Sequence, residues 1–244
     1  QDRAGFSTKS TAKVEVDEDL EREKIIERAG YIYFRPGDLT QFTEEQQRFI
    51  NLVSHVDRNI ILDLRGNGGG DDQFPFELTK VLFTKTQKVP RSTRSQVESP
   101  LQSIGFSLSL LMHDYPEAEL YRDQVRTAYQ NLSFEQLVPF QISSETHELA
   151  GSRALAFRSK IVLIADAGCA SSCETLVEKL GAHPNANIIG SHTMGALHFS
   201  NAITFMLPNS GIIAQIPTLL HEYENDAPEG MGYAPTKYML KIEL

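Results

Sequence analysis

Two short, continuously apolar segments constrain the fold more than any other feature of this chain. They are "NIILDLR" at 59–65 and "KIVLIAD" at 160–166, and both end in charged residues. A run of this kind is typical of a strand buried on both faces of a parallel sheet. Each is followed by a loop of small residues and then by a segment with helical spacing, "QFPFELTKVLFT" and "SSCETLVEKLGAH" respectively. Strands that alternate with helices predict an α/β fold built from βαβ units.

Local patterns predict further elements on either side of these segments. The apolar periodicity, the turn residues and the N-cap Thr43 are the signals used. The predicted elements are a charged helix at 17–29, a strand in "GYIYFRPGD" at 30–38, a helix at 43–56, a third buried strand "ANIIG" at 186–190, and a β-hairpin at 196–218 that turns at 208–211.

The predicted organisation is one large unit with an interruption. Residues 1–29 are expected to form an N-terminal arm and helix, and residues 30–244 an α/β core. The stretch at about 86–155 is rich in Ser, Gln, Glu and Tyr, with helical patterns near "LSLLMHDY" and "EAELYRDQVRTAY". We therefore predict a helical insertion there, and we find no internal repeat.

Composition excludes several classes of function. The net charge of −9 and the absence of a Lys/Arg cluster argue against a nucleic-acid partner. No apolar run reaches the roughly 18 residues that a membrane span needs. The sequence starts at "QDRAGFSTKS" without a signal peptide, which is compatible with a leader that has already been removed. Cys169 and Cys173 are too few for a metal set or a disulfide framework, so buried thiols are expected.

The loops after the two apolar segments carry the residues of chemical interest. The first loop contains Gly66, Gly68, Gly69 and Gly70, and a turn or a close approach to backbone N–H groups explains such a cluster. It is not a P-loop, because no Gly-Lys-Ser/Thr follows. The second loop places serines at the start of a helix, where they act either as an ordinary N-cap or as a nucleophile. Loops at the carboxyl ends of parallel strands converge on one crevice, so N–H donors and a serine would meet there as acyl transfer requires.

Five motifs in order resemble the C-terminal processing (tail-specific) serine peptidase family, which includes the tricorn protease core. They are "NIILDLRGNGGG", "KIVLIADAGCASSCETLVEKLG", "ANIIGSHTMGA", "FMLPNSGIIAQIP" and "EGMGYAPT". The resemblance covers roughly residues 30–85 and 158–237. It implies a ββα spiral core related to the crotonase and Clp protease folds, and no counterpart of the family's PDZ domain is recognisable.

By position, the resemblance implies that Ser171 is the nucleophile. The oxyanion hole would combine the N–H of Ser172 with that of Gly69 or Gly70. Glu174 is expected to pack or cap in the helix that follows. Asp63 and Arg65 are expected to form a structural pair that supports the glycine loop.

The general base departs from the family pattern. Ala196 occupies the position of the family's lysine, which makes the chain closer to the tricorn-like branch with its Ser, His and Glu. Glu229 matches that branch's glutamate, but Tyr33 stands near the position of its histidine. His198, two residues beyond Ala196, is the leading substitute, because residues two apart on a strand face the same side. His192 is the second candidate, and Tyr33 is a further alternative base. The remaining histidines, such as His55 and His221, have no constellation and are expected at the surface.

The sequence therefore predicts a serine endopeptidase that acts on extended peptides and uses a histidine base, without a metal or cofactor. The alternative is an inactive family member that binds a peptide or a small hydrophobic ligand, which the loss of the lysine favours. A crotonase-like acyl-CoA enzyme is a weaker third reading, because basic residues for a nucleotide are missing. The resemblance also implies a periplasmic or secreted location.

Overall fold

A six-stranded sheet forms the centre of the computed structural model, which describes residues 24–98, 141–206, 213–224 and 228–238. The strand order is β1-β2-β3-β6-β7-β10, and all neighbours are parallel except β1 and β2. The strands are β1 Lys24–Glu27, β2 Tyr31–Arg35, β3 Asn59–Asp63, β6 Ile161–Ala165, β7 Ala186–Gly190 and β10 Lys237–Tyr238. The predicted α/β class and the predicted strands at β2, β3, β6 and β7 are confirmed.

The two apolar segments lie side by side in this sheet. In β3 and β6 the register pairs Ile60 with Ile161 and Asp63 with Ile164. The strands therefore end at the same edge, and the glycine loop and the serine loop leave the sheet together. This is the convergence that a parallel sheet requires.

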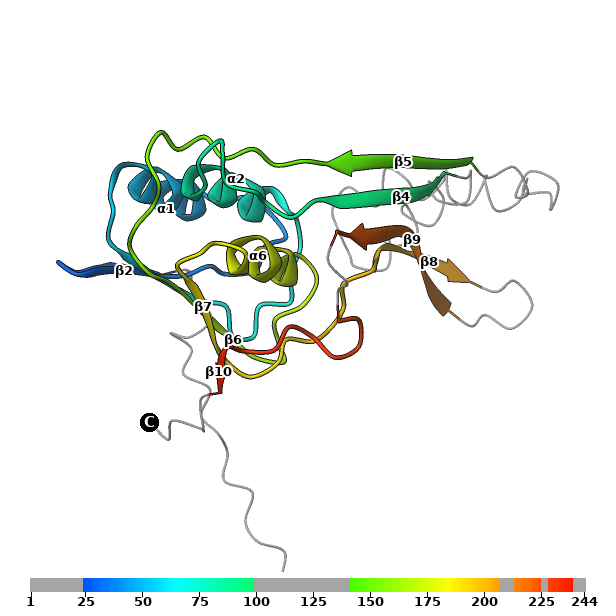
Figure 1. The fold of residues 1–244 in the computed structure, drawn as a ribbon. Coiled ribbons are helices and arrows are strands. Elements are labelled where there is room, and N and C mark those ends of the chain that lie inside the picture. Colours follow the sequence, from blue (N-terminus) through cyan, green and yellow to red (C-terminus); the bar gives the residue numbers. More distant parts are fainter. Residues whose placement is uncertain (1–23, 99–140, 207–212, 225–227, 239–244) are drawn as a thin grey trace, which may run out of the picture.

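Three helices cover one face of the sheet: α1 Glu44–His55, α2 Gln73–Leu82 and α6 Ser172–Gly181 (Figure 1). The predicted cap of α1 is confirmed: Thr43 Oγ1 accepts from the Gln46 N–H at 3.1 Å, and Gln46 Oε1 accepts from the Thr43 N–H at 3.4 Å. This reciprocal pair satisfies two groups at the start of the helix that have no partner within it.

The core lies between these helices and the sheet. Phe34 of β2 stacks on Phe49 of α1 with ring centroids 4.5 Å apart, and it meets the edge of Phe74 of α2 at 5.8 Å. All three rings are buried. Burying a side chain of this size contributes roughly 1.5–3 kcal/mol, so these contacts fix the two helices on the strands.

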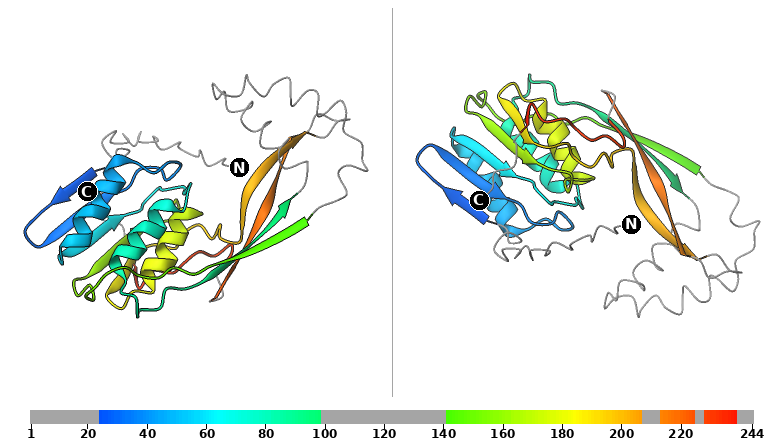
Figure 2. Two further views of the ribbon diagram at one scale, coloured as in Figure 1. Left: turned by 90° about the horizontal axis from the view of Figure 1, so that it is seen from above. Right: turned by 90° about the horizontal axis from the view of Figure 1, so that it is seen from below.

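A second, antiparallel sheet projects to one side of the core (Figures 1 and 2). Its order is β5-β4-β9-β8. The strands are β4 Ser92–Glu98, β5 Gln141–His147, β8 Phe199–Met206 and β9 Ile213–Tyr223. Pairing of β8 with β9 confirms the predicted hairpin, whose predicted turn at 208–211 lies outside the described residues.

Strands β4 and β5 were not predicted, because the insertion at about 86–155 was expected to be helical. The two helical patterns within it, at 108–115 and 117–129, lie outside the described residues. In β4 and β5, which lie on either side of these patterns, short hydroxyl side chains pair across the two strands. Thr93 pairs with Thr146 at 3.1 Å and Ser95 with Ser144 at 2.9 Å between their Oγ atoms. Such cross-strand pairs stabilise a sheet, and they depend on residues about 50 positions apart.

The helix predicted at 17–29 is wrong over its last part, where β1 forms instead. Residues 24–27 pair antiparallel with β2, and Ile25 packs against the core. The open edge of β2 and this apolar contact outweigh the helix preference of the charged residues, which is a weak prior.

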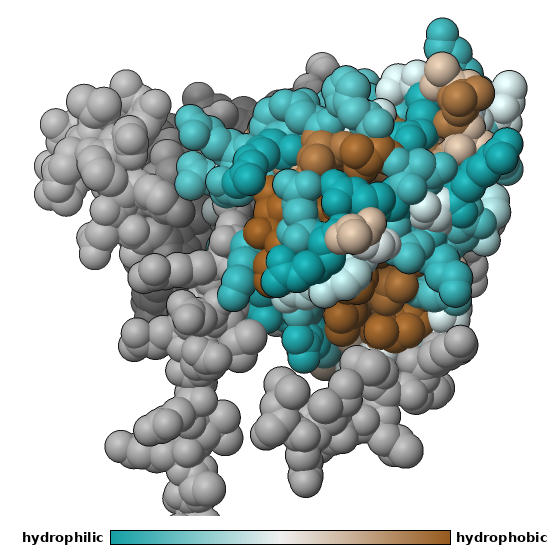
Figure 3. Space-filling model, turned by 90° about the vertical axis from the view of Figure 1, so that its left-hand side faces the viewer, coloured by the Kyte–Doolittle hydropathy of each residue, from teal (hydrophilic) through white to brown (hydrophobic). Residues whose placement is uncertain are grey.

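The face at the left-hand side of Figure 1 is mostly hydrophilic, and its apolar residues form separate patches (Figure 3). Among the described residues, the helices are too short or too polar for any of them to cross a membrane.

Candidate active site

Ser171 stands at a sharp turn between β6 and α6. It is the residue immediately before α6 and has φ 55° and ψ −122°. A residue with a Cβ rarely adopts a positive φ, and such conformations are found where function requires them. A serine on a strained strand-to-helix turn is the arrangement that exposes a nucleophilic Oγ in other hydrolases.

The glycine loop packs directly against this turn. Gly69 has φ +90°, and a Cβ placed on it would lie 2.4 Å from the Ala170 carbonyl oxygen, 2.8 Å from the Ser172 nitrogen and 2.9 Å from the Ser171 Cβ. No side chain fits in that space, so a glycine is required there. The expectation that the glycines allow a close backbone approach is met at this residue.

The N–H groups of the loop are not equivalent. Gly69 N–H donates to Asn67 Oδ1 at 2.9 Å, so it is already engaged. Within the described part of the chain, the N–H groups of Gly70 and Ser172 have no acceptor. The Ser172 hydroxyl donates to the Gly70 carbonyl at 2.8 Å and ties the two segments together. Of the predicted oxyanion donors, Gly70 and Ser172 are therefore the ones able to receive a new acceptor.

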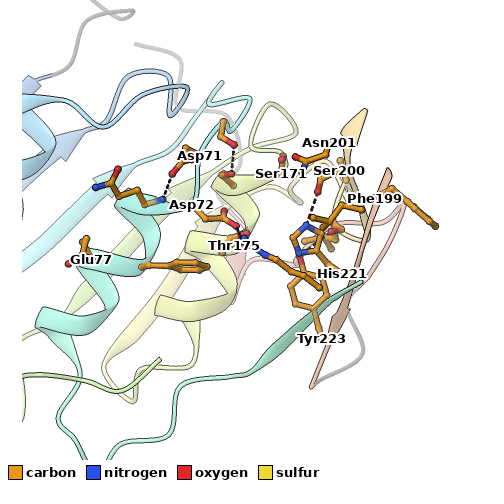
Figure 4. Close-up of a pocket in the computed structure, with 18 of the residues that line it drawn as sticks. Asp71, Asp72, Glu77, Ser171, Thr175, Phe199, Ser200, Asn201, His221 and Tyr223 are labelled. Carbon is orange, nitrogen blue, oxygen red and sulfur yellow. Dashed lines mark hydrogen bonds and ion pairs between the residues drawn. The ribbon is translucent and has the colours of Figure 1, made fainter. Parts of the chain in front are cut away.

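A cavity of about 380 Å³ opens beside Ser171, between the core and the second sheet (Figure 4). An ion pair between Asp72, at the start of α2, and Arg94 of β4 joins its two sides. Both aliphatic and polar side chains line the cavity. They include Ser171, Ser172, Ala196, Leu197, Ser200, Leu219, His221 and Tyr223. In the described ranges no three His, Cys, Asp or Glu side chains gather as metal ligands.

His221 lines this cavity, although the sequence predicted it at the surface. It is buried, and its Nε2 lies 2.8 Å from Ser200 Oγ. His198 is not among the described residues that line the cavity; its Nδ1 contacts the His221 carbonyl at 2.8 Å. His192 Nδ1 contacts the Met231 carbonyl at 3.2 Å, also away from the cavity lining. The prediction for His221 was wrong because β9 pairs with β4 as well as with β8, which covers it.

Glu229 lies close to His198 but contacts its backbone. Its Oε2 accepts from the N–H groups of Leu197 at 2.9 Å and His198 at 2.8 Å. The carboxylate therefore holds the chain just before β8. Ala196, at the position of the family's lysine, lines the cavity beside Ser171.

Glu174 is a fully buried hub beneath the turn at Ser171. Its Oε1 accepts from Thr193 Oγ1 at 2.5 Å and from the Gly195 N–H at 2.8 Å. Its Oε2 accepts from the N–H groups of Ala196 at 2.8 Å and Ser171 at 3.3 Å. The sequence predicted packing or capping for Glu174, and this network shows that it also holds the cavity wall to the turn.

Tyr33 and Asp63 belong to a separate cluster at the base of the glycine loop. Arg65 binds Asp63 through two hydrogen bonds, Nε to Oδ1 at 2.8 Å and Nη2 to Oδ2 at 2.6 Å, which confirms the predicted pair. Tyr33 donates to Asp63 Oδ2 at 3.0 Å. Burial, and then the Asp63 charge, raise the pKa of Tyr33 to about 12. Its phenol is therefore protonated at neutral pH, which makes it a poor base.

The two cysteines form a disulfide, which the sequence did not predict. Cys169 and Cys173 are bonded, with Cα atoms 5.4 Å apart, and both side chains are fully buried. The expectation of separate thiols was wrong, because the turn at Ser171 brings the two residues within the Cα separation that a disulfide needs.

Comparison with known proteins places the fold. A sequence model of peptidase family S41 matches residues 30–236. The solved structures that resemble the chain include mature CPAF complexed with lactacystin, with 16% identity and a TM-score of 0.54 over 91% of this chain and 50% of that chain. A putative peptidase from Parabacteroides merdae matches with 13% identity and a TM-score of 0.54 over 89% of this chain and 56% of its own.

A lipoprotein from Streptococcus agalactiae matches with 12% identity and a TM-score of 0.50, over 91% of this chain and 66% of that chain. This chain thus spans about half to two thirds of the length of these structures. No curated protein matches it significantly. At these identities the structural matches establish the fold alone.

Proposed function

Because the chain belongs to peptidase family S41, which matches residues 30–236, we propose that it is a serine endopeptidase that forms an acyl-enzyme at Ser171. One observation carries this proposal: Ser171 has φ 55° at the start of α6, with Gly69 packed beneath it and a cavity beside it. A structural N-cap serine needs no such backbone conformation, since N-caps ordinarily lie in the β region.

The proposed reaction uses the groups around this turn. Ser171 Oγ attacks the scissile carbonyl carbon, and the N–H groups of Gly70 and Ser172 donate to the oxygen that becomes negative. The amine leaves with a proton, and water then hydrolyses the ester. Donors fixed before the reaction are worth about 3–4 kcal/mol each to such a step, which is why a rigid glycine loop is suited to the site.

The proposed base is a histidine, and the cavity favours His221 over His198. His221 lies directly opposite Arg94 in the pairing of β9 with β4, and both side chains line the cavity that contains Ser171. Ser200 orients its ring through the contact to Nε2. A base must reach the nucleophile directly or through one water, and such contacts often tighten only when substrate binds. Glu229 is then a positioning residue for the chain that leads into β8.

The proposed substrate is an extended peptide. Strand β8 is one of the two outer strands in the order β5-β4-β9-β8, and Ser200 of this strand lines the cavity. An outer strand offers backbone groups to which a peptide can add as a further strand. This geometry would present the peptide's carbonyl groups beside Ser171.

The second candidate is a binding module for a peptide or a small hydrophobic ligand. One observation favours it: Ala196 replaces the lysine, and among the described residues no hydrogen bond joins a basic side chain to Ser171 Oγ. The two candidates make opposite predictions about the reactivity of Ser171.

Labelling with a fluorophosphonate, followed by intact mass, separates them. We expect one adduct on the native chain and none on Ser171→Ala. His221→Gln should slow labelling strongly, whereas His198→Gln should change little. No adduct on a folded native chain would refute the peptidase and support the binding module.

The disulfide supports the predicted periplasmic or secreted location. Disulfides persist in oxidising compartments and are rare in the cytosol, and Cys169 and Cys173 are bonded in the described structure. We therefore propose that the chain works outside the cytosol.

A further inference from the structure

The Cys169–Cys173 disulfide encloses Ser171, the nucleophile of the proposed function. Ser171 lies midway between the bonded cysteines, and the bond joins the last residues of the loop to the first turn of α6. We propose that this disulfide is a positioning element for Ser171, so that the reactivity of the serine requires the oxidised pair. The inference rests on the proposed function and extends it to the redox state of the site.

The backbone at Ser171 needs to be held from both sides. Its φ of 55° lies outside the regions that residues with a Cβ ordinarily adopt. A conformation of this kind persists only where the surrounding structure fixes it. If either side of the turn is released, the residue can return to an ordinary conformation, and its Oγ then leaves the position beside the glycine loop.

Hydrogen bonds anchor the segments on each side of Ser171. Before Ser171, Cys169 N–H donates to the Asp166 carbonyl at 3.0 Å, and the Cys169 carbonyl accepts from Met194 at 2.9 Å. After Ser171, the first turn of α6 holds Cys173 through the Ala170 carbonyl at 3.1 Å. The disulfide is the covalent connection between these two anchored segments that bypasses the strained residue.

The same bond would also hold one proposed oxyanion donor, the Ser172 N–H, in position. The Ser172 N–H lies inside the five residues that the disulfide closes, and its nitrogen is 2.8 Å from the position where Gly69 would carry a Cβ. A small rotation of the turn would therefore move both the nucleophile and one donor relative to the glycine loop. A misplacement of about 1 Å is enough to slow an enzymatic step by roughly a hundredfold.

A merely structural cross-link would behave differently. It would change the stability of the chain and leave the reactivity of folded molecules unaltered. Both sulfurs are fully buried, so a reductant added to the folded protein is a poor test, and the oxidised and reduced forms have to be prepared separately.

The experiment compares the rate of fluorophosphonate labelling in three folded proteins, with circular dichroism to establish folding. They are the native chain, the double variant Cys169→Ala/Cys173→Ala, and the control Val53→Ala, which removes a buried side chain from α1 far from the turn. We expect labelling about tenfold or more slower in the double variant, and an unchanged rate in the control despite its lower melting temperature.

A second preparation provides the same comparison if the double variant does not fold. The native chain is unfolded, reduced and refolded with a phosphine reductant, then labelled before and after treatment with oxidised glutathione. Oxidised glutathione takes two electrons and two protons from the dithiol, which re-forms the S–S bond and releases two glutathione thiols. We expect slow labelling of the dithiol form and recovery after oxidation.

Two results would overturn the inference. The first is equal labelling rates for the oxidised and the disulfide-free folded forms. The second result concerns a native chain that is not labelled at all, an outcome that refutes the proposed function by itself. In that case amide hydrogen exchange at 171–174 is measured in the forms with and without the disulfide. Equal exchange would show that the disulfide does not hold the turn. Faster exchange in the form without the bond would support it.

Discussion

Replacing Gly69 by alanine tests the close approach of the glycine loop to the turn at Ser171. The added Cβ would lie 2.4 Å from the Ala170 carbonyl oxygen and 2.8 Å from the Ser172 nitrogen. Both are backbone atoms, which cannot rotate out of the way. Alanine at the φ of +90° costs about 1–2 kcal/mol, and forcing atoms into a filled space adds about 1–3 kcal/mol. We expect Gly69→Ala to destabilise the chain by about 2–5 kcal/mol.

The same loop supplies two matched controls. Gly66 has φ +73° with nothing within 4 Å of the added Cβ, so Gly66→Ala measures the conformational cost alone. Gly68 has no positive φ and open space around it, so Gly68→Ala should be neutral or slightly stabilising, by about 0.4–1 kcal/mol, through the unfolded state. The expected order of stability is Gly68→Ala, then Gly66→Ala, then Gly69→Ala.

Thermal melting and fluorophosphonate labelling are measured on all three variants. A change of 1 kcal/mol moves the melting temperature of a domain this size by about 2–4 °C, so Gly69→Ala should melt about 4–20 °C lower. Its labelling should slow by about a hundredfold or more, because the displaced loop carries the Gly70 N–H away from its position, and losing one oxyanion donor has an effect of this size. If Gly69→Ala melts and labels like Gly68→Ala, the packing of the loop against Ser171 and the oxyanion role argued from it are refuted.

Three further changes test the buried charges. Glu174→Gln puts an amide NH₂ where a carboxylate oxygen accepts two hydrogen bonds, and should cost about 3 kcal/mol in urea unfolding; an unchanged midpoint would contradict the hub. Glu178 Oε2 forms a buried ion pair with Lys179 Nζ at 2.8 Å, so Glu178→Gln leaves this ammonium buried without its counter-charge and should cost about 3–5 kcal/mol in urea unfolding; an unchanged midpoint would contradict the pair. Burial alone would raise the pKa of Asp63, but the hydrogen bonds and charge of Arg65 lower it below 3.8. A lowered pKa stabilises the fold above pH 4 and less as pH falls, so Asp63→Asn should lose about 2 kcal/mol at pH 7 and flatten the acid limb of a pH–stability curve, and an unaltered limb would refute the pairing.

The features that could be predicted from the sequence are those with a local signal. The apolar runs of β3 and β6 identify buried strands, and Thr43 with Gln46 identifies the start of α1. The meeting of the glycine loop with Ser171 also follows, because adjacent parallel strands end at one edge of the sheet. The turn at Ser171 is therefore largely encoded by short-range patterns.

The features that were missed depend on contacts between distant residues. Strand β4 pairs with β5 and β9 about 50 and 130 positions further along the chain, and its Ser- and Thr-rich sequence has no apolar alternation to indicate a strand. The disulfide required a turn geometry at Ser171 that spacing alone does not specify. Two cysteines four apart predict a shared helix face only if both lie in the helix, and Cys169 lies before it.

The position of the proposed base shows where sequence spacing stops being informative. His198 was selected because residues two apart on a strand share a face, but β8 begins at Phe199, so Ala196 and His198 lie in the preceding loop and the rule does not apply to them. His221 lies inside β9, where the rule does hold: it shares a face with Leu219, which is paired with Ser200. The side that a histidine faces is thus fixed by the register of the second sheet. That register is set by pairings across the whole chain, which is why the histidine that lines the cavity could be identified only from the structure.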